Sequence, residues 1–113
     1  MNLFHIIGRI RSVHIPEKEN PSALILVQYG PQRERQQNRA IEFINAVPIR
    51  IPAFRLEKCR AAVEEDAFVE ISGRVQGVMK GIVSDGFVQT ELVAERVNLV
   101  MDPDAQAESE GEA

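Results

Sequence analysis

A polar segment between two apolar runs carries residue types that are well suited to bind phosphate. Residues 30–39 contain three arginines, three glutamines, one asparagine and a single acid, Glu34. A loop of this composition has little to bury, and planar guanidinium groups match the geometry of phosphate oxygens. We therefore expect the loop to extend from a sheet and to contact the backbone of single-stranded nucleic acid. The alternative is an ordinary solvated hairpin loop.

Binding to a single strand requires cations along the phosphates and flat side chains against the bases. Basic residues occur in the loop and in the flanking apolar runs, and they give eight cation candidates: Arg9, Arg11, Arg33, Arg35, Arg39, Arg50, Arg74 and Lys80. The stacking candidates are Tyr29, Phe43 and Phe87. We expect the core to hold Phe4, Phe54 and Phe68. These residue types predict binding that is sensitive to salt and largely independent of sequence.

The elements that would position these side chains begin with three strands, expected at residues 2–15, 23–29 and 40–51. Alternation in the first strand places Arg9 and Arg11 on one face. Gly8 inside that strand indicates a bend, a bulge or a close backbone approach. Pro48 in the third strand favours an edge or a bulge, because proline cannot donate to a ladder.

A helix is predicted at residues 53–65, with apolar residues on one face and interleaved acids and bases on the other, which is typical of a solvated helix. A fourth strand is expected at 67–77, a glycine-punctuated hairpin at 77–86 and a fifth strand at 87–99. Five strands with one helix between the third and fourth predict an all-β fold, the five-stranded oligonucleotide-binding (OB) Greek-key barrel.

Charge is distributed unevenly along the 113 residues. The net charge is −4, but five acids and no base follow Met101. Residues 1–101 therefore hold twelve acids against thirteen bases. We expect an OB domain at residues 1–101 and a disordered acidic tail at residues 102–113, because the tail is poor in apolar residues.

The sequence lacks the patterns that are typical of membrane proteins, secreted proteins and enzymes. No apolar run has the length of a membrane helix, and the start has no signal-peptide pattern, so we expect a cytoplasmic protein. His5 and His14 lie on opposite faces of the first strand by parity, and Cys59 is the single cysteine. We find no catalytic residues, metal ligands or cofactor-binding motif, and predict that the protein is not an enzyme.

Four segments resemble the bacterial single-stranded DNA-binding protein (SSB) family and its shorter relative, primosomal replication protein N (PriB). They are Asn2 with the IIGRI run at 6–10, EFINAVPI at 42–49, VEISGRV at 69–75 and TELVAERVNLV at 90–100. Their order and spacing span nearly all of residues 1–101. The chain departs from the SSB branch in having no tryptophan and in a short tail, ending SEGEA, without an apolar tip.

The resemblance implies single-stranded DNA as the partner, with RNA as an alternative, and a role in DNA replication, replication restart at the primosome, repair or recombination. It also implies a homodimer or homotetramer and contact with replication or restart proteins. Leu3, His5 and Ile7 on one face of the first strand suit pairing between subunits. The loop favours the PriB branch and the regular helix favours the SSB branch. The alternative function is a protein-interaction module or replication accessory subunit with little DNA affinity.

Overall fold

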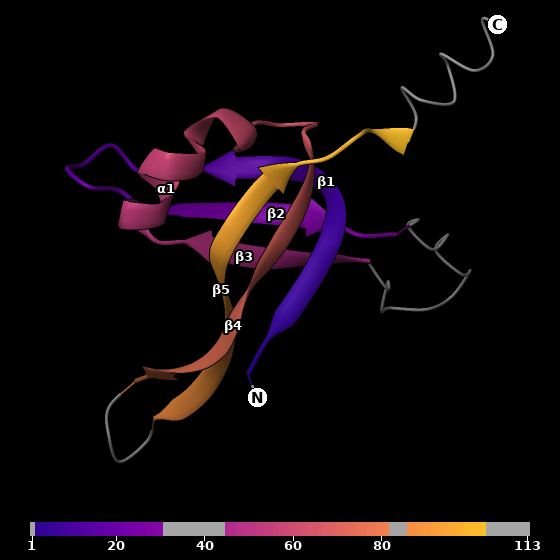
Figure 1. Ribbon diagram of the computed structural model, residues 1–113. Helices are drawn as coiled ribbons and strands as arrows, with labels where there is room; N and C mark the ends of the chain where they lie inside the picture. The colour runs from indigo at the N-terminus through magenta and orange to yellow at the C-terminus, as the bar shows by residue number, and fades with distance from the viewer. Residues whose placement is uncertain (1, 31–44, 82–85, 104–113) are drawn as a thin grey trace, which may run out of the picture.

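Alternating β-branched residues build the sheet of this protein. The computed structural model describes residues 2–30, 45–81 and 86–103. Within these ranges the strands are β1 (Phe4–His14), β2 (Ala23–Gln28), β3 (Ala46–Ile51), β4 (Phe68–Lys80) and β5 (Phe87–Leu99) (Figure 1). The helix α1 (Ala53–Cys59) lies between β3 and β4 and is followed by a 3-10 turn (Arg60–Ala62).

The strands close into a barrel in the order β1-β2-β3-β5-β4, with β4 pairing back to β1. The β3–β5 pair is parallel, with Arg50 beside Val93, and the other pairs are antiparallel. This confirms the predicted five-stranded barrel with a helix between the third and fourth strands. It also places β5 beside β3, which brings residues some 40 positions apart in sequence together on one outer face.

The barrel interior is filled by the inward-facing half of each strand. The core includes Ile10, Ile25, Ile49, Ile71 and Val69, each with no more than 1% of its surface exposed. From the helical segment, Leu56, Ala62 and Val63 join this core. Their side chains fix α1 against the barrel, and the outward-facing residues of the strands are left to form the surface.

Two glycines allow the barrel to close tightly. A Cβ atom at Gly8 would collide with the backbone carbonyl oxygen of Gln28, so β1 and β2 approach closely there. This confirms the close backbone approach expected at Gly8. Two positions further along β1, the ladder shifts register between Ile10 and Ser12, and a bulge at Arg11 increases the local twist. Gly73 on β4 is equally crowded, by the carbonyl oxygen of Val93.

The helix is shorter than predicted. Regular α-helix ends at Cys59, not at residue 65, and the backbone N–H of Val63 donates to the carbonyl of Arg60 in the tighter turn. The chain must then reach β1, where Asp66 N–H donates to the Ile10 carbonyl and Ile10 N–H to the Ala67 carbonyl. Asp66 has a positive φ of 68° at this junction. A helix continued to residue 65 would be incompatible with these two bonds.

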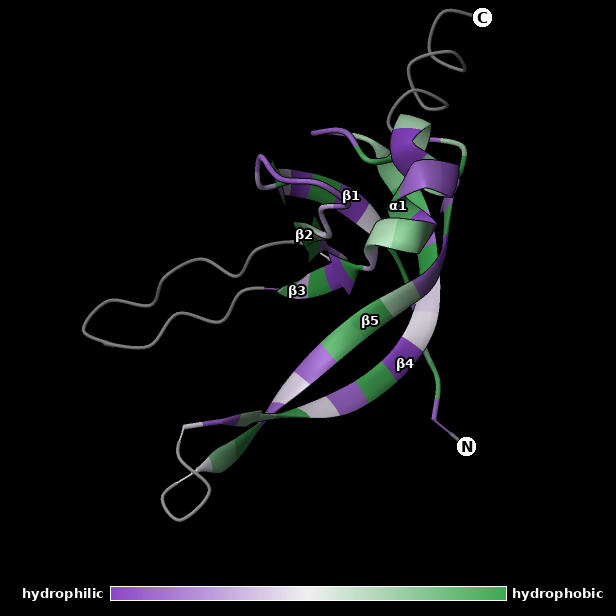
Figure 2. Ribbon diagram, turned by 90° about the vertical axis from the view of Figure 1, so that its left-hand side faces the viewer, coloured by the Kyte–Doolittle hydropathy of each residue, from purple (hydrophilic) through white to green (hydrophobic). Residues whose placement is uncertain are grey.

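The β4–β5 hairpin is longer than predicted and extends away from the barrel (Figure 2). The expected glycine-rich turn from residue 77 is strand as far as Lys80, which pairs with Phe87. Gly77 does not break the strand, because it pairs with Thr90 in a ladder that continues to Lys80. The hairpin therefore forms an arm beside the outer face of β2 and β3.

The remaining strand predictions differ only at their ends. β1 begins at residue 4, and the side chain of Asn2 extends its pairing by exchanging two hydrogen bonds with the backbone of Val75 at 2.6 and 2.8 Å. β3 begins at Ala46 within the described residues, and 40–44 lie outside them. Phe54 was predicted in the core, but it is 61% exposed because Leu56, not Phe54, points inward.

Candidate nucleic-acid interface

A hollow of about 190 Å³ lies between the outer face of β2 and β3 and the β4–β5 arm. We refer to it as the groove. It is lined by Leu24, Pro48, Arg50, Val78, Lys80, Gln89, Thr90 and Glu91. Alternation explains the contribution of β2 and β3, because Ile25 and Ile49, the neighbours of Leu24, Pro48 and Arg50, are buried. The groove thus combines apolar side chains, two cations and one carboxylate.

Charge in the groove is partly paired. Arg50 Nε lies 2.5 Å from Glu91 Oε1 in an ion pair that connects β3 with β5. Glu91 is 15% exposed, whereas about half of Arg50 remains exposed. Lys80 on the arm is exposed and forms no ion pair with a described residue. Arg50 therefore keeps surface for a phosphate, although it must share its charge with Glu91.

Phe87 stands at the outer end of the arm, directly opposite Lys80 in the ladder. It is 63% exposed. Residues directly opposite one another share a face of an antiparallel pair, so Phe87 and Lys80 lie on the side of Val78 and Gln89, which line the groove. An exposed aromatic ring next to a cation is the arrangement that stacks on a base while a phosphate is neutralised.

A second hollow, about 490 Å³, lies where β1 and the end of β2 meet the beginning of the C-terminal segment. This β1–β2 hollow is lined by Ile7, Gly8, Arg9, Arg11, Gln28, Tyr29, Gly30, Phe68 and Pro103. Three of the predicted binding residues, Arg9, Arg11 and Tyr29, therefore share one hollow. Tyr29 is 47% exposed, and its backbone N–H donates to the Asn45 carbonyl at 2.9 Å.

The guanidinium of Arg9 is bound within the chain. It donates to both carboxylate oxygens of Asp102, at 2.8 and 3.0 Å, and to the carbonyl oxygen of Asp66 at 2.9 Å. The group also lies 5.4 Å from the ring centre of Phe68. Such a bidentate pair is among the stronger kinds of ion pair. Arg9 therefore anchors the first acid of the C-terminal segment.

Arg11 is more accessible than Arg9. Its Nε donates to Gln28 Oε1 at 2.7 Å, and Nη1 lies 3.5 Å from a carboxylate oxygen of Asp66. Arg74 lines neither the groove nor the β1–β2 hollow, and it lies 3.9 Å from Glu95. Predicted residues 33, 35, 39 and 43 (Arg33, Arg35, Arg39 and Phe43) lie outside the described residues.

Sequence reasoning missed the neutral and acidic lining of the groove. Leu24, Gln89 and Glu91 were not predicted, because their convergence depends on the parallel β3–β5 pairing. The alternating pattern of 87–99 could have placed Gln89 and Glu91 on one face, but it could not reveal that Arg50 lies beside them.

The described residues hold no group of three or more His, Cys, Asp or Glu side chains that could bind a metal ion. None of the helices in the described ranges is long and apolar enough to cross a membrane. Desolvation by burial raises the pKa of the Cys59 thiol above its ordinary value of 9.0, against a smaller opposing effect of a backbone hydrogen bond.

Comparison with solved structures finds the same barrel in single-stranded DNA-binding proteins. Rim1, a mitochondrial single-stranded DNA-binding protein from S. cerevisiae, has a TM-score of 0.59 at 18% identity, covering 89% of this chain and 96% of that one. The N-terminal domain of PriB from Thermoanaerobacter tencongensis, a dimeric structure, has a TM-score of 0.57 at 13% identity, with 89% and 98% covered.

A complex of the Plasmodium falciparum SSB with single-stranded DNA also matches, with a TM-score of 0.57, 13% identity, and 90% and 96% of the two chains covered. No protein-family model matches the chain, and no curated protein sequence matches it. At these identities the similarity establishes the fold, the OB barrel of SSB and PriB proteins, which the sequence resemblance predicted.

Proposed function

We propose that this protein binds single-stranded DNA, largely without sequence preference, in DNA replication, replication restart or recombination. The observation that carries the proposal is the groove, where Arg50 and Lys80 flank apolar side chains and Phe87 stands exposed on the same face of the arm. Structural neighbours with the same barrel are single-stranded DNA-binding proteins, and one of them is in complex with its DNA.

In the proposed complex, the phosphates lie along Arg50 and Lys80 and a base stacks on Phe87. Arg11 and Tyr29 in the β1–β2 hollow offer a second cation and a second ring at the base of the 31–44 segment. Arg33, Arg35, Arg39 and Phe43 remain proposed contacts from that segment, and Arg74 remains a proposed contact outside both hollows. Arg9 would contribute mainly by holding Asp102 away from the other cations.

The test of the groove uses a fluorescently labelled dT oligomer of about 6 nucleotides, within the size range bound by one OB barrel. We expect the double variant Arg50→Gln, Lys80→Gln to bind it about tenfold or more weakly at low salt, because two phosphate contacts are lost. The control variant Lys18→Gln, Arg60→Gln loses the same charge outside the groove and should bind like the wild type. Equal affinities of the two double variants would refute the groove as the binding site.

We also propose that the protein is a homodimer or homotetramer. The first half of β1, residues 4–8, is hydrogen-bonded only to β4 and leaves one backbone edge unpaired by strands in the described ranges. Leu3 is 63% exposed and Ile7 46% exposed on the outer face of this half-strand. An open edge beside apolar side chains is suited to pairing with a second copy.

Light scattering on the purified chain measures this directly. We expect a mass of two or four times 12.7 kDa. The double variant Leu3→Lys, Ile7→Lys should shift the mass towards that of one chain, because it places charge on the pairing face. A wild-type mass of a single chain would show that these side chains face solvent in a monomer.

A further inference from the structure

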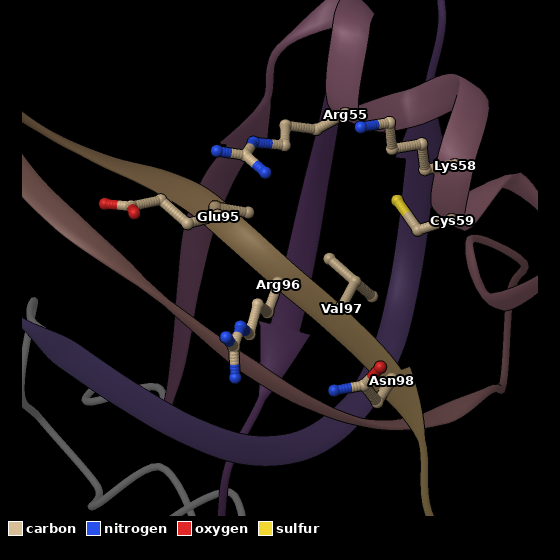
Figure 3. Close-up of a pocket in the computed structure, with 8 residues that line it drawn as sticks. Arg55, Lys58, Cys59, Glu95, Arg96, Val97 and Asn98 are labelled. Carbon is tan, nitrogen blue, oxygen red and sulfur yellow. The ribbon is translucent and has the colours of Figure 1, made fainter.

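A third hollow, about 170 Å³, lies between α1 and β5 (Figure 3). We refer to it as the α1–β5 hollow. It is lined by Arg55, Lys58 and Cys59 of α1 and by residues 94–98 of β5. None of the DNA-binding residues predicted from the sequence belongs to it.

Two of the three cations that line the α1–β5 hollow lie on one face of the helix. Arg55 and Lys58 are three positions apart, a spacing that places side chains next to each other on a helix. Figure 3 shows both on the side of the helix that borders β5. Glu57 and Arg60 line a different hollow, with Asn20 and Pro21. The mixed charges of this helix are therefore sorted, and the side next to β5 is basic.

Arg55 carries a donor that no residue in the described ranges satisfies. Its Nε atom is buried, and no described residue supplies an acceptor. A buried donor without an acceptor is unfavourable, so such groups in folded proteins normally have a partner. Lys58 is exposed and forms no ion pair with a described residue. The buried Nε is closed to an anion in the hollow, so the terminal guanidinium nitrogens of Arg55 and the ammonium of Lys58 are the groups that would contact one.

The acid of the hollow does not replace such an anion. Glu95 supplies no acceptor to Arg55 Nε, and its nearly half-exposed carboxylate lies 3.9 Å from Arg74 instead. Arg96 extends from β5 away from α1 in Figure 3 and contributes little to the side bordered by the helix.

An exposed aromatic ring stands next to the α1–β5 hollow. Phe54 is 61% exposed, and the guanidinium of Arg55 lies 4.9 Å from its ring centre. Phe54 therefore combines a solvent-facing ring with an adjacent cation that also lines the hollow. Proteins that bind single-stranded nucleic acid use this combination, because bases stack on aromatic rings and cations neutralise phosphates.

The α1–β5 hollow continues the groove along one strand. Residues 89–91 of β5 line the groove and residues 94–98 line the hollow, with only Leu92 and Val93 between them. From the other side, β3 carries Arg50 in the groove and ends one residue before Pro52, the residue that precedes α1. A single-stranded DNA molecule that leaves the groove along β5 would therefore reach the α1–β5 hollow next.

We propose that the α1–β5 hollow is a second phosphate-binding site, where Arg55 and Lys58 hold a backbone phosphate of single-stranded DNA and Phe54 stacks on a base. This site rests on the proposed function, because it lengthens the track that begins in the groove. It predicts that longer single strands bind more tightly than those that fill the groove alone, and that the gain depends on α1.

The test compares labelled dT oligomers of about 6 and about 20 nucleotides, chosen to fill the groove alone or to extend beyond it. Two double variants are compared. The first carries Arg55→Gln and Lys58→Gln, and the charge-matched control carries Lys18→Gln and Arg60→Gln. We expect the first variant to bind the 20-mer about tenfold more weakly than the control does, and the 6-mer equally well. For the first variant and the 20-mer only, the slope of log K against log salt should become less steep by about 0.7 for each phosphate contact that is lost.

The possible failures are distinguishable. If both double variants bind the 20-mer equally, the hollow takes no phosphate, and the groove and the proposed function stand. If the wild type binds neither oligomer, the proposed function fails together with this site. The single variant Lys58→Glu alters only an exposed side chain. It should weaken binding of the 20-mer selectively, and unchanged binding would overturn the proposal even if the Arg55 substitution disturbed the fold.

Discussion

Glu91 places a carboxylate inside the groove, in contact with Arg50. The pair joins two parallel strands, and the acid is mostly buried while the arginine is half exposed. A phosphate that approaches Arg50 is repelled by Glu91 and competes with it for the guanidinium. Glu91 is therefore expected to hold the arginine in place at some cost to its affinity for phosphate.

Replacing Glu91 with glutamine tests this competition. The variant Glu91→Gln should bind the short dT oligomer more tightly, because the carboxylate that competes with phosphate for Arg50 is removed. The gain should be only about two- to fivefold, because partly exposed ion pairs of this kind contribute little energy. Glu57→Gln on α1 is the matched control, since it makes the same change of charge outside the groove. Anisotropy titrations compare the two, and weaker binding of Glu91→Gln would show that the carboxylate mainly positions Arg50.

Cys59 offers a test of burial next to the α1–β5 hollow. Because burial raises the pKa of its thiol, little thiolate forms at neutral pH in the folded protein. Alkylation by iodoacetamide should be slower in the native chain than in urea at pH 8, and it should keep accelerating as the pH rises above about 9. The neutral thiol is favoured by folding, so any contribution of this group to stability is lost as pH rises through that range. Equal native and unfolded rates at pH 8 would contradict the raised pKa.

The sequence shows the type of each candidate residue, but it does not show the environment of that residue in the fold. Arg50 and Lys80 were chosen as cations, and both line the groove, where their role in DNA binding remains a prediction. Arg9 looked equivalent in the sequence, but its partner Asp102 lies 93 positions away, a contact that no local pattern can show. Phe54 was assigned to the core from helical spacing, yet the helix turns it outward and buries Leu56.

At the scale of elements, the closure of the barrel depends on backbone crowding at glycines. A methyl group at Gly73 would overlap the carbonyl oxygen of Val93 and lie 2.9 Å from a ring carbon of Phe4. A backbone atom cannot move aside as a flexible side chain can, so the β4–β5 ladder would have to shift. The position is also next to a register shift between Ser72 and Gly73.

Gly73→Ala should therefore lower the free energy of unfolding by about 1–3 kcal/mol, as overpacking does elsewhere. Gly30→Ala is the control, because its new methyl group would be 3.4 Å or more from the side chain of Asn45. Urea denaturation monitored by circular dichroism measures both variants. If Gly73→Ala were as stable as Gly30→Ala, the close approach of β4 and β5 would not limit the fold.

Alternation of side chains predicted the strands well, and it predicted their ends less well. The fifth strand begins and ends where its pattern indicated. The fourth continues three residues further, because strand pairing with 87–90 outweighs the glycine at 77. The helix ends early, because two backbone bonds to Ile10 fix the chain at residues 66 and 67. The helix end therefore depends on a partner distant in sequence, and the end of the fourth strand depends on pairing within its own hairpin.

At the scale of the whole molecule, the structure shows where several of the unevenly distributed charges of the sequence lie. Asp102, the first acid after residue 101, pairs with Arg9. The proposed DNA-binding cations Arg50 and Lys80 lie in the groove, and Arg55 and Lys58 lie beside it on α1. This charge distribution favours the proposed binding of a polyanion by a nearly neutral barrel, because these cations lie near β5 while much of the acidity follows residue 101 in the sequence.

We propose that this barrel binds single-stranded DNA through its cations. The most direct measurement is fluorescence anisotropy of a labelled dT oligomer of about 20 nucleotides, titrated with the wild-type protein at several salt concentrations. We predict binding at micromolar protein or below in low salt, with log K falling linearly with log salt by about 0.7 for each phosphate neutralised. A mixed-sequence strand should bind equally well and a duplex more weakly. No binding at micromolar protein, or an affinity that salt leaves unchanged, would contradict the proposed binding of single-stranded DNA.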